Sequence, residues 1–227
     1  LLIDPRPLAA EHLLDDDDLT PHPPFPSEHV SYGDVIAYKG DILRRSFQRL
    51  CQRPDCRLHH ELARFAAQHA SWLEDYALFM ALKVHHQWAV WTDWEPELVQ
   101  RRPEALADWR QRLADEIAYR RFEQYLFDSQ WRALRQYAND VGLLILGDMP
   151  IFVGHDSADV WAHQELFQMD DQGHPTVVAG VPPDYFSATG QLWGNPLYRW
   201  DAMRTDGYAW WIARLRRALE QVDLVRL

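Results

Sequence analysis

A short aliphatic run that ends at an acidic residue is the feature that most constrains the fold of this chain. Residues 143–146 are all leucine or isoleucine, and they are followed at once by Gly147, Asp148 and, two residues later, Pro150. Four residues are too few for a helix, and the glycine and proline close the run, so it predicts a buried β-strand. Asp148 is therefore expected at the carboxyl end of that strand.

A long connection with an unusual composition follows this strand. Residues 149–200 show no long helical periodicity, and connections of this length inside a domain are usually either binding elements or disordered. Disordered segments are poor in aromatic residues. This one is rich in them, with Tyr185, Phe186, Trp193, Tyr198 and Trp200. We therefore expect an ordered binding loop.

Helical periodicity flanks the loop on both sides. Apolar residues at helical spacing predict helices over residues 42–50, 72–86 and 113–139, and another after Asp206-Gly207. Within the long helix, the face expected to be buried carries Phe122, Leu126, Ala133 and Tyr137. Residues 222–227 predict a second buried strand. The order helix, strand, long loop, helix, strand is the repeat of a parallel α/β fold.

Two predicted strands cannot close a sheet, so we expect the chain to be part of a larger α/β fold. Residues 1–31 look loop-like, with an acidic run at 15–18 that is typical of a solvated helix start and a proline cluster at 21–26. We expect residues 1–110 to form a loop and helical insertion subdomain. Residues 111–227 are expected to hold the α/β part and its binding loop.

Composition argues against several classes of partner. The formal net charge of -11 repels phosphate backbones and anionic lipid surfaces, so neither nucleic acid nor a membrane is expected. No apolar stretch approaches the roughly 20 residues of a membrane span. The two cysteines, Cys51 and Cys56, lack the second pair that a zinc site needs. They predict thiols in a reducing compartment, and hence a cytoplasmic protein.

Motifs for metals and cofactors give no positive indication. His85 and His86 are adjacent on a predicted helix and point about a hundred degrees apart, so they are poorly placed to share one ion. The chain has no phosphate loop, no Gly-x-Gly-x-x-Gly, no Gly-x-Ser-x-Gly and no His-Glu-x-x-His. We therefore expect neither a metal nor a cofactor.

The residue types of the loop suit a sugar ligand. Sugars present C–H faces that stack on aromatic rings and hydroxyls that exchange hydrogen bonds with polar side chains. The stacking candidates are Tyr185, Phe186 and Trp193, and the hydroxyl-binding candidates are Asp148, Asp184 and Gln191. Aromatic loops also pack on their own domain, and Trp193 and Tyr198 are open to that reading, as Asp148 is to a role in a turn or cap.

Three motifs resemble one enzyme family closely. They are residues 147–153 (GDMPIFV), residues 155–163 (HDSADVWAH) and residues 177–198, which include VPPDYFS and QLWGNPLY. This sequence is similar to the amylomaltases, the 4-alpha-glucanotransferases of glycoside hydrolase family seventy-seven, and the similarity extends over essentially the whole chain. The resemblance implies a TIM-like (β/α)8 barrel with inserted subdomains. It also implies disproportionation of alpha-1,4-glucans and maltooligosaccharides by a retaining double displacement.

The resemblance implies roles for individual residues. Asp148 matches the aspartate that binds the donor sugar, and Tyr185 with Phe186 matches a mobile loop on the acceptor side. Gln191 and Trp193 continue that loop toward the cleft. Arg226 matches the arginine two positions before the nucleophilic aspartate, whose ionised form its charge would support.

By the same resemblance, the nucleophile would follow Leu227 and the general acid/base would lie further on. We therefore expect an internal fragment, truncated at both ends and inactive alone. Two alternatives stay open: an alpha-glucan hydrolase on the same barrel and a non-catalytic glucan-binding module.

Overall fold

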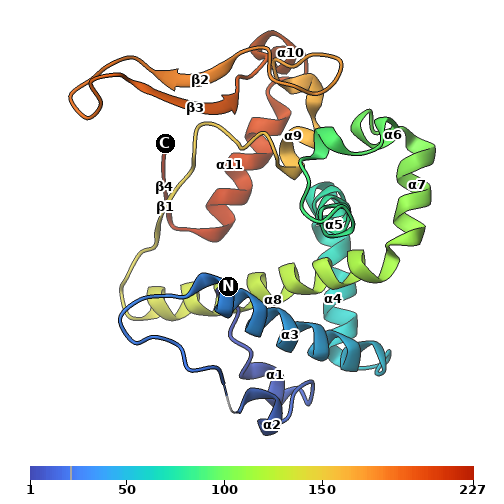
Figure 1. Ribbon diagram of the computed structural model, residues 1–227. Helices are drawn as coiled ribbons and strands as arrows, with labels where there is room; N and C mark the ends of the chain where they lie inside the picture. The colour runs from blue at the N-terminus through green and yellow to red at the C-terminus, as the bar shows by residue number, and fades with distance from the viewer. Residues whose placement is uncertain (21) are drawn as a thin grey trace. The chain divides into compact units, whose positions relative to one another are not determined.

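The computed structural model describes residues 1–20 and 22–227, so Pro21 of the proline cluster lies outside the described residues. The described chain is mainly helical and holds two small sheets of two strands each (Figure 1). Within these residues, no helix is both long enough and apolar enough to cross a membrane. The chain is therefore a mixed helix and strand structure, as the sequence predicts, with few strands.

Contacts divide the chain into two compact units, each made of two separate stretches of sequence. The first unit combines residues 1–74 with residues 118–134. The second combines residues 75–117 with residues 135–227. The expected boundary near residue 110, between a helical insertion and an α/β part, stays a prediction.

The first unit is entirely helical in its regular structure. Its elements are α1 (Pro7–Ala10), α2 (Asp16–Leu19), α3 (Tyr32–Cys51), α4 (Arg57–Gln68), the start of α5 (Ala70–His85) and the middle of α8 (Ala114–Asp140). On α3, Ile42, Phe47 and Leu50 are buried at the spacing of one helical face. The Phe47 ring lies 5.6 Å from Tyr119 and 5.5 Å from Phe122 of α8, measured between centroids. These rings form the centre of the first core.

The first 31 residues are more ordered than the sequence predicts. They include α1 and α2, and Leu8 and Leu13 are buried. The acidic run does begin a helix: the Asp15 backbone N–H donates to Asp18 Oδ2 at 2.8 Å. Asp18 also pairs with Arg49 of α3 at 2.6 Å. The prediction of a loop was wrong here because these contacts come from α3, far along the chain.

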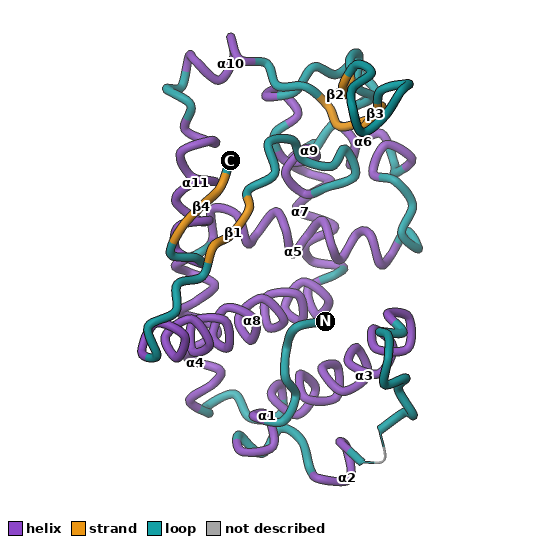
Figure 2. The backbone as a smooth tube through the Cα atoms, turned by 90° about the vertical axis from the view of Figure 1, so that its left-hand side faces the viewer, coloured by secondary structure: helices purple, strands orange, loops and turns teal. Residues whose placement is uncertain are grey.

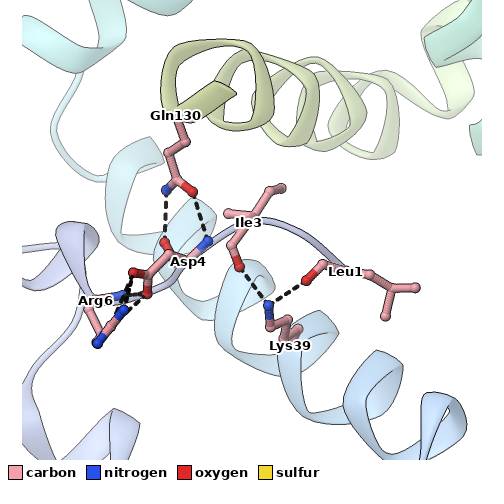
Figure 3. Close-up of polar contacts among 6 residues, drawn as sticks. All are labelled: Leu1, Ile3, Asp4, Arg6, Lys39 and Gln130. Atoms are coloured by element: carbon pink, nitrogen blue, oxygen red, sulfur yellow. Dashed lines mark hydrogen bonds and ion pairs between the residues drawn. The ribbon is translucent and has the colours of Figure 1, made fainter. Parts of the chain in front are cut away.

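The amino-terminal segment is held by polar contacts with α3 and α8 (Figure 3). Lys39 Nζ donates to the carbonyl oxygen of Ile3 at 2.8 Å and to that of Leu1. The Asp4 backbone N–H donates to Gln130 Oε1 at 2.7 Å, and Gln130 Nε2 donates back to the Asp4 carbonyl at 2.8 Å. These bonds satisfy backbone groups of a segment that has no regular secondary structure of its own.

The second unit carries all the described strands. Besides parts of α5 and α8, its elements are a 3₁₀ turn (Trp91–Asp93), α6 (Pro96–Val99), α7 (Pro103–Arg112), β1 (Leu146–Asp148), α9 (Ala158–Ala162), a 3₁₀ turn (Gln164–Leu166), β2 (Val178–Val181), β3 (Gln191–Pro196), α10 (Trp200–Thr205), α11 (Ala209–Gln221) and β4 (Leu224–Arg226). Its core includes Leu78, Trp91, Trp161, Phe167 and Tyr198. Trp91 and Trp94, which follow α5, are buried, whereas Trp88 is 59% exposed.

A buried lysine holds together two turns of the second unit. Lys83 of α5 has a side chain only 5% exposed, and its Nζ lies 2.5 Å from Asp156 Oδ2. The same ammonium donates to the carbonyl oxygens of Trp88 at 3.0 Å and Ala89 at 2.7 Å. A buried charge requires such partners. The ion pair therefore fixes the turn after α5 against the residues that precede α9.

The two predicted buried strands are shorter and more exposed than expected. Strand β1 begins at Leu146 rather than residue 143, and β4 covers Leu224 to Arg226 only. Leu143 and Leu144 are 62% and 67% exposed. Among the described residues each strand pairs only with the other, side by side in parallel (Figure 2), and the first and last residues of both strands are exposed. An aliphatic run predicts a buried strand only when other elements supply the cover.

Helix α8 confirms the predicted long helix but not all of its predicted face. Phe122 and Leu126 are buried, whereas Tyr137 is 67% exposed and Ala133 is also exposed. The helix passes from the first unit into the second at residue 135. The spacing of apolar residues shows which face of a helix can be buried. It does not show where along the helix the elements that cover this face end.

Candidate functional site

Asp148 and Arg226 form a two-pronged ion pair on neighbouring strands. Arg226 Nε donates to Asp148 Oδ1 at 2.7 Å, and Arg226 Nη2 donates to Oδ2 at 2.5 Å. Both side chains remain open to solvent, with 60% of Asp148 and 70% of Arg226 exposed. The planar guanidinium matches the carboxylate fork, which fixes the orientation of both groups.

The strand register explains why these two residues meet. Strands β1 and β4 are parallel, and Asp148 is paired in register with Arg226. The Met149 N–H donates to the Arg226 carbonyl at 3.0 Å, which carries the ladder one residue past the strand. Parallel strands end at the same edge of a sheet, and this edge is where ligands bind in α/β folds.

At the opposite end of the two strands, Asp223 locks their register. Its Oδ2 accepts from the Ile145 N–H at 2.8 Å and from Asn139 Nδ2 at 3.0 Å, and its Oδ1 accepts from Arg135. These bonds, the one to the Ile145 N–H first, lower the pKa of Asp223 to about 2. Asp223 therefore stays ionised at neutral pH and keeps β1, β4 and the end of α8 together.

The ion pair also sets the charge of Asp148. The hydrogen bonds from Arg226 lower the pKa of the Asp148 carboxyl below its usual value. A lowered pKa means that the carboxylate persists to more acidic pH, and that the pair is lost only as pH falls through that lowered value. Asp148 thus presents a fixed negative charge with exposed oxygen atoms at the strand edge.

The predicted binding loop contains a β-hairpin. Strands β2 and β3 are antiparallel, with Val181 opposite Gln191, and Figure 1 shows them as a long two-stranded ribbon. Gly190 ends the connection with a φ of +74°, a conformation that favours glycine. A Cβ at Gly190 would lie 2.4 Å from the Val181 carbonyl oxygen. A side chain at this position would therefore force the hairpin open.

The tip of the hairpin displays two aromatic side chains. Tyr185 is 98% exposed and Phe186 is 88% exposed, with ring centroids 5.7 Å apart and planes at 89°. Asp184 Oδ1 accepts from the N–H groups of Phe186 and Ser187, both at 2.9 Å. Asp184 therefore shapes the turn that carries the rings. Its expected role in binding a sugar hydroxyl stays a prediction.

Gln191 and Trp193 lie two residues apart on β3, and their side chains meet. Trp193 Nε1 donates to Gln191 Oε1 at 3.0 Å, and the Trp193 side chain is about half exposed. This contact places an apolar ring face and an amide group next to each other on one strand. Such a pair is suited to a ligand that has both C–H faces and hydroxyls.

The strand pair and the hairpin are connected through the backbone that follows Asp148. No hydrogen bond among the described residues joins Asp148 directly to the aromatic side chains of the hairpin. The Phe152 ring lies 6.3 Å from that of Trp193, and Asn195 of β3 donates to the Val153 carbonyl at 2.9 Å. The hairpin base is therefore attached to the segment that leaves β1.

Sequence analysis did not identify the residues that hold the backbone near Asp148 in place. Tyr198, which was open to a core reading, is indeed core at 2% exposure, whereas the half-exposed Trp193 is not. Asp223 and Arg214 carried no expectation, although both make hydrogen bonds to backbone groups near Asp148. A charged residue directly before an aliphatic strand was the available indication for Asp223. The expected binding and catalytic roles of the site residues stay predictions.

Comparison with known proteins identifies the family of this chain. The whole chain, residues 1–227, matches the family described as 4-alpha-glucanotransferase. The chain belongs to this family. It is 48% identical to a 4-alpha-glucanotransferase of Thermus thermophilus over 226 residues, which are 100% of this chain and 44% of the relative. It is 45% identical to one of Synechocystis sp., covering 97% of this chain and 44% of the relative.

A solved structure has the same fold. An amylomaltase from Streptococcus agalactiae in complex with acarbose superposes with a TM-score of 0.92 at 37% identity, covering 99% of this chain and 45% of that one. The chain thus spans a little under half the length of the relatives it matches. The predicted family is confirmed.

Proposed function

We propose that this chain is part of a 4-alpha-glucanotransferase that moves alpha-1,4-glucan segments between maltooligosaccharides. One observation carries the proposal: a chain of this family holds an exposed, ionised Asp148, oriented by Arg226, where two parallel strands end. A carboxylate at such an edge is suited to bind sugar hydroxyls. Strands β1 and β4 would be two strands of a TIM-like (β/α)8 barrel.

The reaction would be a retaining double displacement. In such a site one carboxylate attacks the anomeric carbon and a second carboxyl group protonates the leaving oxygen. By the family resemblance, the attacking aspartate would be the residue two positions after Arg226, on the same side of the strand. Arg226 would then act on two carboxylates: it orients Asp148 and favours the ionised form of the nucleophile.

Transfer requires that a sugar hydroxyl reach the intermediate before water does. Tyr185 and Phe186 stand almost fully exposed at the hairpin tip, where nothing else in the described chain covers them. We propose that their rings close over the acceptor sugar and exclude water. Gln191 and Trp193 would bind the same ligand further down the hairpin, and acarbose, with which the similar amylomaltase was solved, would bind to the same residues.

We expect Tyr185→Ala or Phe186→Ala to lower transfer more than hydrolysis. An open loop admits water, and each lost stacking face should weaken acceptor binding by about 0.5–1.5 kcal/mol, or roughly two- to tenfold. The measurement follows products of maltotriose in the full-length natural protein, comparing longer oligosaccharides with new reducing ends. Tyr32→Ala is the control, because Tyr32 is also an exposed tyrosine but belongs to the first unit. An unchanged ratio of transfer to hydrolysis in both loop variants would refute the water-barrier role.

A further inference from the structure

Three backbone carbonyls just after Asp148 are held by side chains instead of by secondary structure. Arg214 Nη2 donates to the Pro150 carbonyl at 2.6 Å, and the Tyr198 hydroxyl donates to the Ile151 carbonyl at 2.8 Å. Asn195 Nδ2 donates to the third of these carbonyls, that of Val153, at 2.9 Å. The path from Asp148 to the loop is therefore set by donors from β3, from the residues after β3 and from α11.

These donors are themselves held in place. Tyr198 is 2% exposed, and the rings of Trp211 and Phe167 lie 5.2 and 5.3 Å from its own. Arg214 Nη1 donates to the Tyr198 hydroxyl oxygen at 3.4 Å, and its guanidinium lies 5.1 Å from the ring centroid of Trp211. Arg214, the Tyr198 hydroxyl and the Ile151 carbonyl thus form a chain of hydrogen bonds. Arg214 donates to Tyr198, and Tyr198 donates to Ile151.

The protonation of Tyr198 supports this direction. Burial, more than any other cause, raises the pKa of the Tyr198 hydroxyl above its usual value. The phenol therefore keeps its proton at neutral and mildly alkaline pH. In this form it can donate to the Ile151 carbonyl.

We propose that Tyr198 and Arg214 are positioning residues, which fix the backbone after Asp148 and so set the distance from Asp148 to Gln191 and Trp193 of the hairpin. This inference rests on the proposed function, because it requires that Asp148 and the hairpin residues Gln191 and Trp193 bind the same glucan. Neither side chain would touch the substrate. A shift of about 1 Å in such a constellation can cost about a hundredfold in rate.

Tyr198→Phe tests the proposal with the smallest change available. Phenylalanine keeps the buried ring and removes only the hydroxyl, so we expect kcat/KM for maltotriose transfer to fall about tenfold. Tyr38→Phe is the matched control, since the Tyr38 hydroxyl also donates to a backbone carbonyl, that of Leu19 at 3.2 Å, but in the first unit. The control is expected to keep the wild-type rate. Arg214→Met, which retains an aliphatic stem over the tryptophans, provides a second variant.

A double-mutant cycle distinguishes positioning from a structural role. If Tyr198 acts through Asp148, the Tyr198→Phe penalty should shrink to within about twofold in an Asp148→Asn background, because interacting sites are not additive. A purely structural role predicts the same penalty in both backgrounds and overturns the proposal, as does a wild-type rate in both Tyr198→Phe and Arg214→Met. If the unmodified full-length protein does not transfer glucan, the proposed function itself fails. If Asp148→Asn leaves transfer unchanged, the role of Asp148 in binding the substrate fails and this inference fails with it. If Asp148→Asn lowers transfer strongly while Tyr198→Phe and Arg214→Met both keep the wild-type rate, only this inference fails.

Discussion

Replacing Asp148 by asparagine is expected to lower kcat/KM for glucan transfer by about a hundredfold or more, with little loss of stability. Asparagine keeps the shape of the side chain but loses its charge, and charged acceptors placed at a reacting centre contribute effects of this size. Both the fork with Arg226 and the bonds to sugar hydroxyls would weaken together. The measurement is the initial rate of maltotriose disproportionation by the full-length natural protein.

Asp4→Asn is the matched control for this variant. Asp4 also forms a two-pronged, solvent-exposed pair, with Arg6 Nε at 3.0 Å and Arg6 Nη2 at 2.7 Å, but it lies in the first unit. It should transfer glucan at the wild-type rate. Arg226→Lys keeps the charge but loses the fork, so an intermediate rate is expected. If Asp148→Asn stays within threefold of the wild type, Asp148 does not bind the substrate.

Replacing Lys83 by methionine should destabilise the second unit by clearly more than the loss of a surface contact would. Methionine fills the space of the stem but leaves Asp156 and the carbonyls of Trp88 and Ala89 without their donor. Breaking a buried pair costs about 3–5 kcal/mol, and partial exposure of Asp156 reduces this to about 2–3 kcal/mol. For a chain of this size, that corresponds to a melting temperature lower by about 5–10 °C.

Lys39→Met is the comparison for this effect. Lys39 also donates to two backbone carbonyls, but it forms no ion pair with a carboxylate in the described part of the chain and is only half-buried. Its replacement should cost less than about 1.5 kcal/mol. Thermal unfolding of the three proteins under one buffer gives the comparison. Equal melting temperatures for the two variants would show that the Lys83–Asp156 pair contributes no more than an ordinary surface contact.

The sequence was informative where local chemistry decides the structure. Helices α5, α8 and α11 have continuous apolar faces, and their positions follow from spacing alone. The placement of Asp148 at a strand end follows from the abrupt change of residue type at Gly147. Tyr185 and Phe186, which the sequence analysis named as stacking candidates of the loop, are exposed at the hairpin tip.

Pairings between residues distant in sequence could not be predicted in this way. Arg226 was expected to act on the nucleophilic aspartate two positions after it, and only the register of β1 and β4 shows that it pairs with Asp148, 78 residues earlier. The bonds from Tyr198 and Arg214 to the segment after β1 likewise depend on tertiary packing. Burial was misjudged for Leu143 and Tyr137, because an apolar side chain is buried only where another element covers it.

The most direct test of the account follows the fate of an isotope-labelled acceptor. The full-length natural protein would be incubated with unlabelled maltotriose and labelled glucose, and the products would be separated by length. A glucanotransferase predicts label in maltose and longer oligosaccharides, with almost no increase in reducing ends. One new reducing end for every bond broken, with no label in any oligosaccharide, would instead show a hydrolase. Unchanged maltotriose would show a protein that binds glucan without acting on it, and either result would contradict the proposed transfer.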